Sequence, residues 1–449
     1  MRADDWGNPL STSSSAAAAA LQTATTAFLG WRTDTMAHLT AALEADPDFA
    51  LPHALRGLII AGLRKPELLA KAQGCLAAAH AARPPMSGRE QGYIHALEAT
   101  LAGRITEAAA AYEHMVRAHP RDLFALRLAQ FELFWIGEAD WMRDISERAS
   151  PYWSRAVPGF GGFQAMRAFG LEETGEYALA EVCGREAVQL DPTDCWGTHA
   201  VAHVLVMQGR LGEGAAFVSG QKNNWSAANH IRHHLWWHLA LFEIERGDYA
   251  AALAIYDERL RDLASPLMQA VPDFYVDLQN DVALLQRLEL RGIDVGARWE
   301  PIADLAAERI GNHTNPFTSP HAVLALAAAE RLEAAEEALE AMRAFVIEDG
   351  GVLAARYQLA ALPASEAALA HRKGDHAAVL AHLLPARRNL WQMGGSHAQR
   401  DLFFQILAHA ALRLERRDVL DILLEELRGL GLEHLEERTS YADALAALH

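Results

Sequence analysis

The pattern Gly175-Glu176-Tyr177-Ala178-Leu179-Ala180, followed by Ala187 and Pro192, combines a turn residue, an aromatic residue and small residues at regular spacing. Glycine has no Cβ and can turn the chain between two helices, and the alanines behind it let the two helices approach closely. Proline cannot continue a helix, so it marks the start of the next unit. The stretch therefore predicts a pair of antiparallel helices joined by a tight turn.

The same frame recurs along the chain. Copies begin at Gly103 and at Gly247, and a more degenerate copy begins at Gly30. Gly209 lies 34 positions after Gly175, and Gly247 lies 38 positions after Gly209, close to the period of about 34 residues of a tetratricopeptide repeat. Several copies in register predict an all-α fold, a superhelical α-solenoid of tetratricopeptide-like helix-turn-helix repeats that bury one continuous core.

The repeat register predicts one continuous array in three segments. Residues 1–27 form an N-terminal segment and first helix, residues 28–264 form the regular repeats, and residues 265–449 form degenerate helical repeats with a C-terminal cap. No shift in composition marks a separate fold. Prolines punctuate the last segment, and its expected helical stretches include Val276–Arg291, Val323–Phe345 and Glu366–His371.

Composition excludes several classes of protein. The chain has 449 residues and a net charge of −18, which disfavours nucleic acid and anionic membranes as partners. Three cysteines without a C-x-x-C motif give no disulfide framework. Apolar runs stay below the roughly 18 residues of a membrane span, and the acidic start Met1–Asp5 is unlike a secretory signal. We expect a cytoplasmic protein, and the sequence leaves open whether it forms a homo-oligomer.

Histidine is the most informative residue type, with 21 in the chain. His199 and His203 are four positions apart, as are His234 and His238, so each pair occupies one face of a helix. The two pairs are separated by 35 positions, about one repeat. First helices of neighbouring repeats lie side by side, at roughly 8–10 Å between axes. We therefore predict that the four imidazoles face one groove.

Three interpretations of this quartet stay open. Paired histidines on facing helices can hold a divalent metal such as zinc, iron or manganese, and neutral imidazole can also act as a general base. The quartet could instead form the polar wall of a ligand site, or hydrogen-bond neighbouring repeats. Trp196 and Trp237 lie in the same region, where helix packing or an apolar ligand wall would explain them. His230 and His233 are interpreted as structural.

A second group of polar residues lies in Gly394–Asp401. The two glycines end a helix, and Ser396 with Gln399 matches the capping box that opens the next one. The first turn also carries an imidazole and a carboxylate four positions apart, suited to acid/base chemistry, and a guanidinium suited to holding a carboxylate. The candidate site residues here are Gln399, Arg400 and Asp401, with His397 as a secondary candidate.

Two more carboxylates, Asp277 and Asp281, are also four positions apart. They would be suitable additional ligands for a metal ion beside the histidines. A solvated helix face is the interpretation that their spacing favours, so they are secondary candidates.

Three polar motifs are not generic repeat residues. They are Asp194-Cys195-Trp196 with His199 and His203; His234 with Trp237-His238 and Ala240-Leu241; and Gly394-Gly395-Ser396 with Ala398-Gln399-Arg400-Asp401. Together they resemble the tetratricopeptide repeat protein 38 family over nearly the whole chain. The resemblance implies an α-solenoid of degenerate repeats and supplies no activity.

Two functions of different classes are compatible with these patterns. The first is a binding protein whose concave, His- and Trp-rich groove holds a small polar molecule or a peptide, and analogy between folds favours it. The second is a hydrolase-like enzyme in which the quartet holds a metal or moves protons, while Arg400 and Asp401 orient the substrate. A groove that binds acidic peptide ends would favour Lys, Arg and Asn. This groove is predicted to present imidazoles instead, which favours a small enclosed site.

Overall fold

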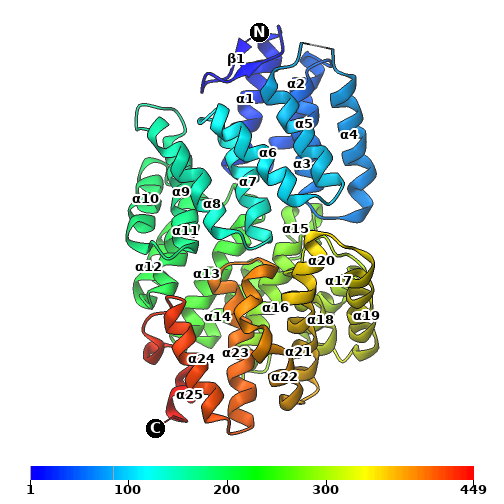
Figure 1. Cartoon of the computed structure of the whole chain (residues 1–449). Helices are drawn as coiled ribbons and strands as arrows, with labels where there is room; N and C mark the ends of the chain where they lie inside the picture. The colour runs from blue at the N-terminus through cyan, green and yellow to red at the C-terminus, as the bar shows by residue number, and fades with distance from the viewer. Residues whose placement is uncertain (1, 84, 449) are drawn as a thin grey trace. The chain divides into compact units, whose positions relative to one another are not determined.

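The structure, a computed structural model, describes residues 2–83 and 85–448 and is almost entirely helical (Figure 1). Two compact units divide it. The first comprises Met1–Phe134, Glu138–Val201 and Asn224–Asn229, and the second comprises Trp135–Gly137, Ala202–Asn223 and His230–His449. Among the described residues, no helix combines the length and apolar character needed to cross a membrane.

The first unit begins with a short β-hairpin, which a series of antiparallel helix pairs follows along the chain. Successive helices pack as pairs, as in α1 with α2, α3 with α4, α5 with α6 and α9 with α10. Its elements are β1 (Arg2–Ala3), β2 (Pro9–Leu10), α1 (Ser15–Leu29), α2 (Thr35–Ala45), α3 (Ala50–Ala61), η1 (Pro66–Leu68), α4 (Leu69–Ala81), α5 (Gly88–Leu101), α6 (Ile105–Ala118), α7 (Leu123–Trp135), α8 (Ala139–Ala149), η2 (Ser150–Tyr152), α9 (Phe160–Glu173), α10 (Tyr177–Leu190) and the start of α11 (Cys195–Met207).

The second unit repeats this architecture around α16, which contacts α13, α18 and α23. Every residue of α16 from Asp277 to Leu288 is buried. Besides the end of α11, the unit contains α12 (Leu211–Gln221), α13 (Ile231–Glu245), α14 (Tyr249–Ile255), η3 (Tyr256–Leu260), α15 (Pro266–Ala270), α16 (Tyr275–Glu289), η4 (Gly296–Trp299), α17 (Glu300–Ala307), α18 (Thr318–Ala328), α19 (Leu332–Glu348), α20 (Val352–Arg356), η5 (Tyr357–Ala361), α21 (Leu362–Arg372), α22 (His376–Ala386), η6 (Arg387–Met393), α23 (His397–Arg413), α24 (Arg417–Gly429), η7 (Leu435–Glu437) and α25 (Ala442–Ala446).

Four of the predicted turns are confirmed, whereas at Gly30 (φ −83°) the left-handed residue is the next one, Trp31 (φ 58°). Gly103, Gly175, Gly209 and Gly247 all have φ between 66° and 82°, the left-handed region in which a Cβ is costly. Each one separates the two helices of a pair, so the all-α, α-solenoid architecture of repeated helix pairs follows from local turn chemistry.

The predicted helical stretch Val323–Phe345 is wrong in one respect. The chain leaves the helix at Glu330, which has φ 59°, so α18 and α19 form two antiparallel helices instead of one. A charged residue in place of the usual turn glycine hid this break from the sequence pattern. The other two stretches correspond to α16 and α21.

The turn glycines give a direct test of this account. A Cβ at Gly175 (φ 82°) would meet no atom within 4 Å, so Gly175→Ala should cost only backbone strain, about 1–2 kcal/mol of unfolding free energy. Gly74, inside α4, also has open space around it and no positive φ. Gly74→Ala should therefore stabilise the protein by about 0.5–1 kcal/mol. Urea denaturation of both variants measures the two effects, and equal signs would contradict the assignment of Gly175 as a strained turn.

Candidate functional site

Three of the predicted histidines come together in the second unit. His203 lies on α11, and His234 and His238 lie one turn apart on α13. The ring centroids of His203 and His238 are 4.5 Å apart, and those of His234 and His238 are 4.8 Å apart. One ring nitrogen from each lies within 4.8 Å of the others. We refer to His203, His234 and His238 as the histidine cluster.

Burial keeps the imidazoles of this cluster neutral. Desolvation lowers the pKa of His234 to about 4 and the pKa values of His203 and His238 well below the usual 6.5. The Nδ1 of His234 donates to the Oδ1 of Asn280, on α16, at 2.8 Å. That bond fixes the tautomer, so the Nε2 of His234 carries the lone pair. The cluster is thus chemically suited to coordinate a metal ion or to accept a proton.

His199, the fourth member of the predicted quartet, belongs to the first unit. It lies one turn before His203 on α11, where its ring stacks on Trp196 at 4.5 Å and lies 5.2 Å from Phe169. Trp196 is buried in the same unit, whereas Trp237 stacks on His234 at 5.1 Å in the second unit. The assignment of all four histidines to a single site stays a prediction.

A cavity of about 330 Å³ opens beside the first turns of α23 in the second unit. Three of the residues singled out from the sequence, His397, Arg400 and Asp401, line it together. Its other lining residues are the charged Arg387, Arg388 and Glu426 and the apolar or small Met207, Leu390, Trp391, Phe404, Leu427, Gly429, Leu430 and Leu432. We refer to this space as the α23 cavity.

The charged side chains of the α23 cavity are held in place by specific partners. Arg387 and Arg388 both pair with Glu426, at 2.7 and 2.6 Å. Asp401 accepts from the Nε2 of Gln405 at 2.6 Å and from the hydroxyl of Tyr441. Arg400 donates to the carbonyl of Gly395, just before the start of its own helix. The wall is preorganised, with more cationic than anionic groups.

Arg287 of α16 contacts one residue beside the histidine cluster and one residue beside the α23 cavity. Its Nη2 donates to the carbonyl of Ala398 at 2.8 Å, and its guanidinium lies 5.7 Å from the ring of Trp237. After burial and the neighbouring His234, the charges of His397 and Arg400 also lower the pKa of His203. Cluster and cavity are therefore electrostatically coupled parts of one polar region.

Gln399 has a structural role in this region. The Ser396 amide donates to the Oε1 of Gln399 at 2.9 Å, and the Gln399 amide donates to the Ser396 hydroxyl at 3.2 Å. The capping box predicted from the sequence is therefore confirmed. Gly394 and Gly395 are required by geometry, since Cβ atoms there would lie 2.7 Å from the Trp135 carbonyl oxygen and 2.6 Å from the Phe317 ring.

The solvated-face interpretation of Asp277 and Asp281 is wrong, because their exposed fractions are 2% and 1%. The Oδ2 of Asp277 lies 2.5 Å from the Nδ1 of His230 and 3.1 Å from the Nδ1 of His233. Burial alone would raise the pKa of Asp277, but these imidazoles lower it. A helix buried on all sides has no face exposed to solvent. The spacing of the two residues does not reveal this burial, because it arises from packing against helices distant in sequence.

His230, His233 and Asp277 form a group that the sequence interpretation missed. Their ligand atoms also lie close enough to hold a metal ion. One signal in the sequence pointed to it: His230 and Asp277, and then His234 and Asn280, pair at nearly equal separations of 47 and 46 residues. Such a repeated offset is what two facing helices in register produce.

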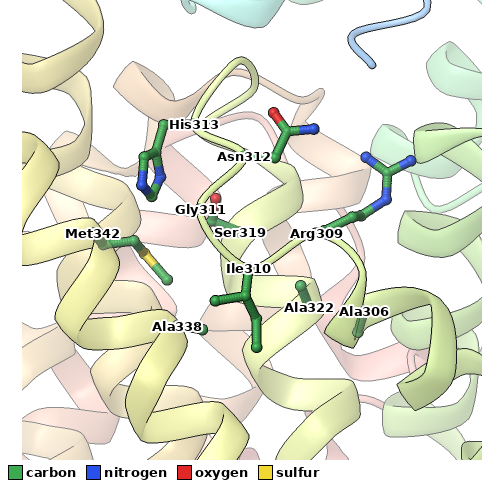
Figure 2. A pocket seen from close by; sticks show the side chains of 10 residues that line it. All are labelled: Ala306, Arg309, Ile310, Gly311, Asn312, His313, Ser319, Ala322, Ala338 and Met342. Carbon is green, nitrogen blue, oxygen red and sulfur yellow. The ribbon is translucent and has the colours of Figure 1, made fainter. Parts of the chain in front are cut away.

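A second, much smaller cavity is drawn in Figure 2. It has a volume of about 20 Å³ and lies between the loop after α17 and the helices α18 and α19. A space of this size holds about one water molecule. Arg309, one of its lining residues, pairs with Asp273 at 2.7 Å. This cavity is therefore too small for an organic ligand.

Comparison with known proteins gives structural matches of low sequence identity. No family model matches the chain. Yeast Tom70 is 13% identical over 95% of this chain and 87% of its own, with a TM-score of 0.39. The tetratricopeptide repeat domain of P58(IPK) is 15% identical over 74% of this chain and 90% of its own, with a TM-score of 0.19.

The buried acid Asp281 gives this region a distinctive pH dependence. Burial raises its pKa to about 7, although Arg261 lies 3.2 Å away. In the unfolded chain the carboxyl titrates near pH 3.9, so the unfolded state loses its proton first as the pH rises. The unfolding free energy of the wild type should therefore fall between about pH 4 and 7, relative to Asp281→Asn, by up to about 1.4 kcal/mol per pH unit.

Chemical denaturation of both proteins at several pH values measures this difference. A constant difference between wild type and Asp281→Asn across the range would contradict a raised pKa at Asp281.

Proposed function

We propose that this protein binds a small amphipathic anion, a carboxylate or phosphate carried on an apolar body, in the α23 cavity. The observation that carries the proposal is the convergence of His397, Arg400 and Asp401 on one cavity of about 330 Å³. This volume lies within the range of about 300–1,000 Å³ usual for small-molecule sites.

The lining favours an anion. Arg387 and Arg388 share the single carboxylate of Glu426, and Asp401 is already engaged by Tyr441 and Gln405. The start of α23 adds the positive end of a 17-residue helix, which favours negative charge.

The rest of the wall favours an apolar body on that anion. Trp391, Phe404 and Leu430 are among the apolar side chains of the cavity, and they would bury the non-polar part of the ligand. A peptide would fit a space of this size through its end. The proposal also includes membership of the tetratricopeptide repeat protein 38 family and a cytoplasmic location.

A second candidate function, metal-assisted chemistry, rests on the histidine cluster. Three buried neutral imidazoles, one of them oriented by Asn280, are a suitable donor set for zinc or another first-row divalent ion. Such an ion would act as a Lewis acid. Asp401 and Arg400 would then orient the substrate, and the histidines would hold the ion.

Arg400 provides the test of anion binding. Benzoate is a suitable probe of a carboxylate on an apolar body, and benzyl alcohol is its neutral counterpart. Calorimetry should show benzoate binding that Arg400→Met weakens by about 10- to 100-fold, because a charge-assisted hydrogen bond contributes about 1.5–3 kcal/mol.

Arg416→Met, which removes an exposed guanidinium paired with Asp418 on α24, is the matched control and should bind as the wild type does. Equal benzoate affinity in wild type and Arg400→Met would contradict the proposal. Binding of benzyl alcohol to the wild type as tight as that of benzoate would also contradict it.

Elemental analysis tests the metal candidate separately. Untagged wild type should contain close to one equivalent of zinc, iron or manganese, and the double variant His203→Ala/His234→Ala should contain none. His371→Ala, a half-buried histidine of α21 that hydrogen-bonds His409, is the control and should keep the metal. Metal-free wild type that also takes up no added zinc would eliminate this candidate while leaving the anion proposal intact.

A further inference from the structure

Arg127, on α7 of the first unit, is a buried cation without the usual partners. Its exposed fraction is 2%. Neither its Nε nor its Nη1 has a hydrogen-bond partner within residues 2–83 and 85–448. A guanidinium carries five N–H donors, and burying them without acceptors is costly. Such a guanidinium is expected to have hydrogen-bond acceptors, and the described part of the chain provides none for these two nitrogens.

Aromatic rings surround this guanidinium. Its Cζ lies 4.8 Å from the ring centre of Trp196, 5.1 Å from that of Trp31 and 5.7 Å from that of Phe131. The two indoles are themselves 5.1 Å apart. The rings stabilise the positive charge through their faces, but they accept no conventional hydrogen bond in the plane of the guanidinium.

The two indoles add donors of their own. The Nε1 atoms of Trp31 and Trp196 are buried, and neither has a hydrogen-bond partner in the part of the chain that the structure describes. Two indole N–H groups and two guanidinium nitrogens without acceptors therefore lie in one aromatic cluster. Buried polar groups in native proteins are satisfied in the great majority of cases, so a cluster of unsatisfied donors points to a bound acceptor.

Other buried arginines of the first unit show the contrast. The Nε of Arg89 lies 2.5 Å from Asp122, and an Nη of Arg64 lies 2.9 Å from Glu132. The acid that acts electrostatically on Arg127 is Asp194, whose Oδ1 accepts instead from the Gly197 amide at 2.8 Å. Burial raises the pKa of Asp194 to about 6 and lowers that of Arg127 to about 10. Asp194 thus offsets part of the charge without satisfying the donors.

We propose that Arg127, Trp31 and Trp196 form a binding site for a small oxyanion, the carboxylate or phosphate group of a metabolite, in the first unit. The oxygens accept from the guanidinium and from the two indole N–H groups. The rings exclude water, and the attraction between charges is stronger in such surroundings. The site uses no residue of the α23 cavity or of the histidine cluster, so it stands independently of the function proposed above.

Acetate and inorganic phosphate are the probes, with glycerol as the neutral control and ionic strength held constant. Quenching of tryptophan fluorescence and the rise in melting temperature report binding by the full-length protein. Arg127→Met should lower the affinity for the preferred anion at least tenfold. Arg167→Met removes a guanidinium that pairs with Glu147 at 2.5 Å in the same unit, and it should bind as the wild type does.

Two further variants separate binding from a purely structural role. Trp196→Phe keeps an aromatic ring but removes one donor, so the affinity should fall several-fold in a protein that stays folded. Asp194→Asn removes a negative charge near the guanidinium and should raise the affinity several-fold. Binding of acetate alone or of phosphate alone would support the site and identify the anion. The proposal is overturned if neither anion binds the wild type more tightly than Arg127→Met, or if Asp194→Asn does not strengthen binding.

Discussion

The second unit depends on the pairing of polar side chains that α16 carries into the protein interior. A helix buried on every side can pair its polar groups only with neighbouring helices, and an unpaired buried charge costs several kcal/mol. One carboxylate oxygen of Asp277 pairs with His230 and His233, the Oδ1 of Asn280 accepts from His234, and Arg287 donates to the Ala398 carbonyl. A shift of α13 or α23 by one residue would break these bonds. Their register fixes where His234 and the first turn of α23 lie.

This constraint explains why the candidate site has its present form. The Asn280 bond holds His234 in one tautomer, and the Arg287 bond holds the start of α23, where the capping box of Ser396 and Gln399 orients the turn bearing Arg400 and Asp401. The polar groups that maintain the fold of the second unit thus position the groups that could bind a ligand. Such positioning by rigid helices is more accurate than positioning by loops.

Local patterns in the sequence predicted much of this arrangement. The turn glycines, the i, i+4 histidines and the capping box depend on short-range geometry, and each of them was visible in the chain. The pairing of Asp277 with His230 was not, because two carboxylates four positions apart are normally taken to mean one solvated helix face. Arg127 escaped notice for a related reason: its neighbours Trp31 and Trp196 come from distant segments, and no sequence spacing brings them together.

The electrostatics of the second unit connect its two candidate functions. A divalent ion held by three neutral imidazoles would keep its full charge, and Arg287 and Arg400 lie close enough to disfavour positive charge on His238 and His203. Such an ion would need an anion nearby for compensation, and the cation-rich α23 cavity is where an anion is most favoured. A bound carboxylate or phosphate would lower the electrostatic cost of the metal, and the metal would strengthen binding of the anion. Linkage makes these two effects equal in free energy, so an anion in the cavity would strengthen metal binding at the cluster by the same factor as the metal would strengthen anion binding.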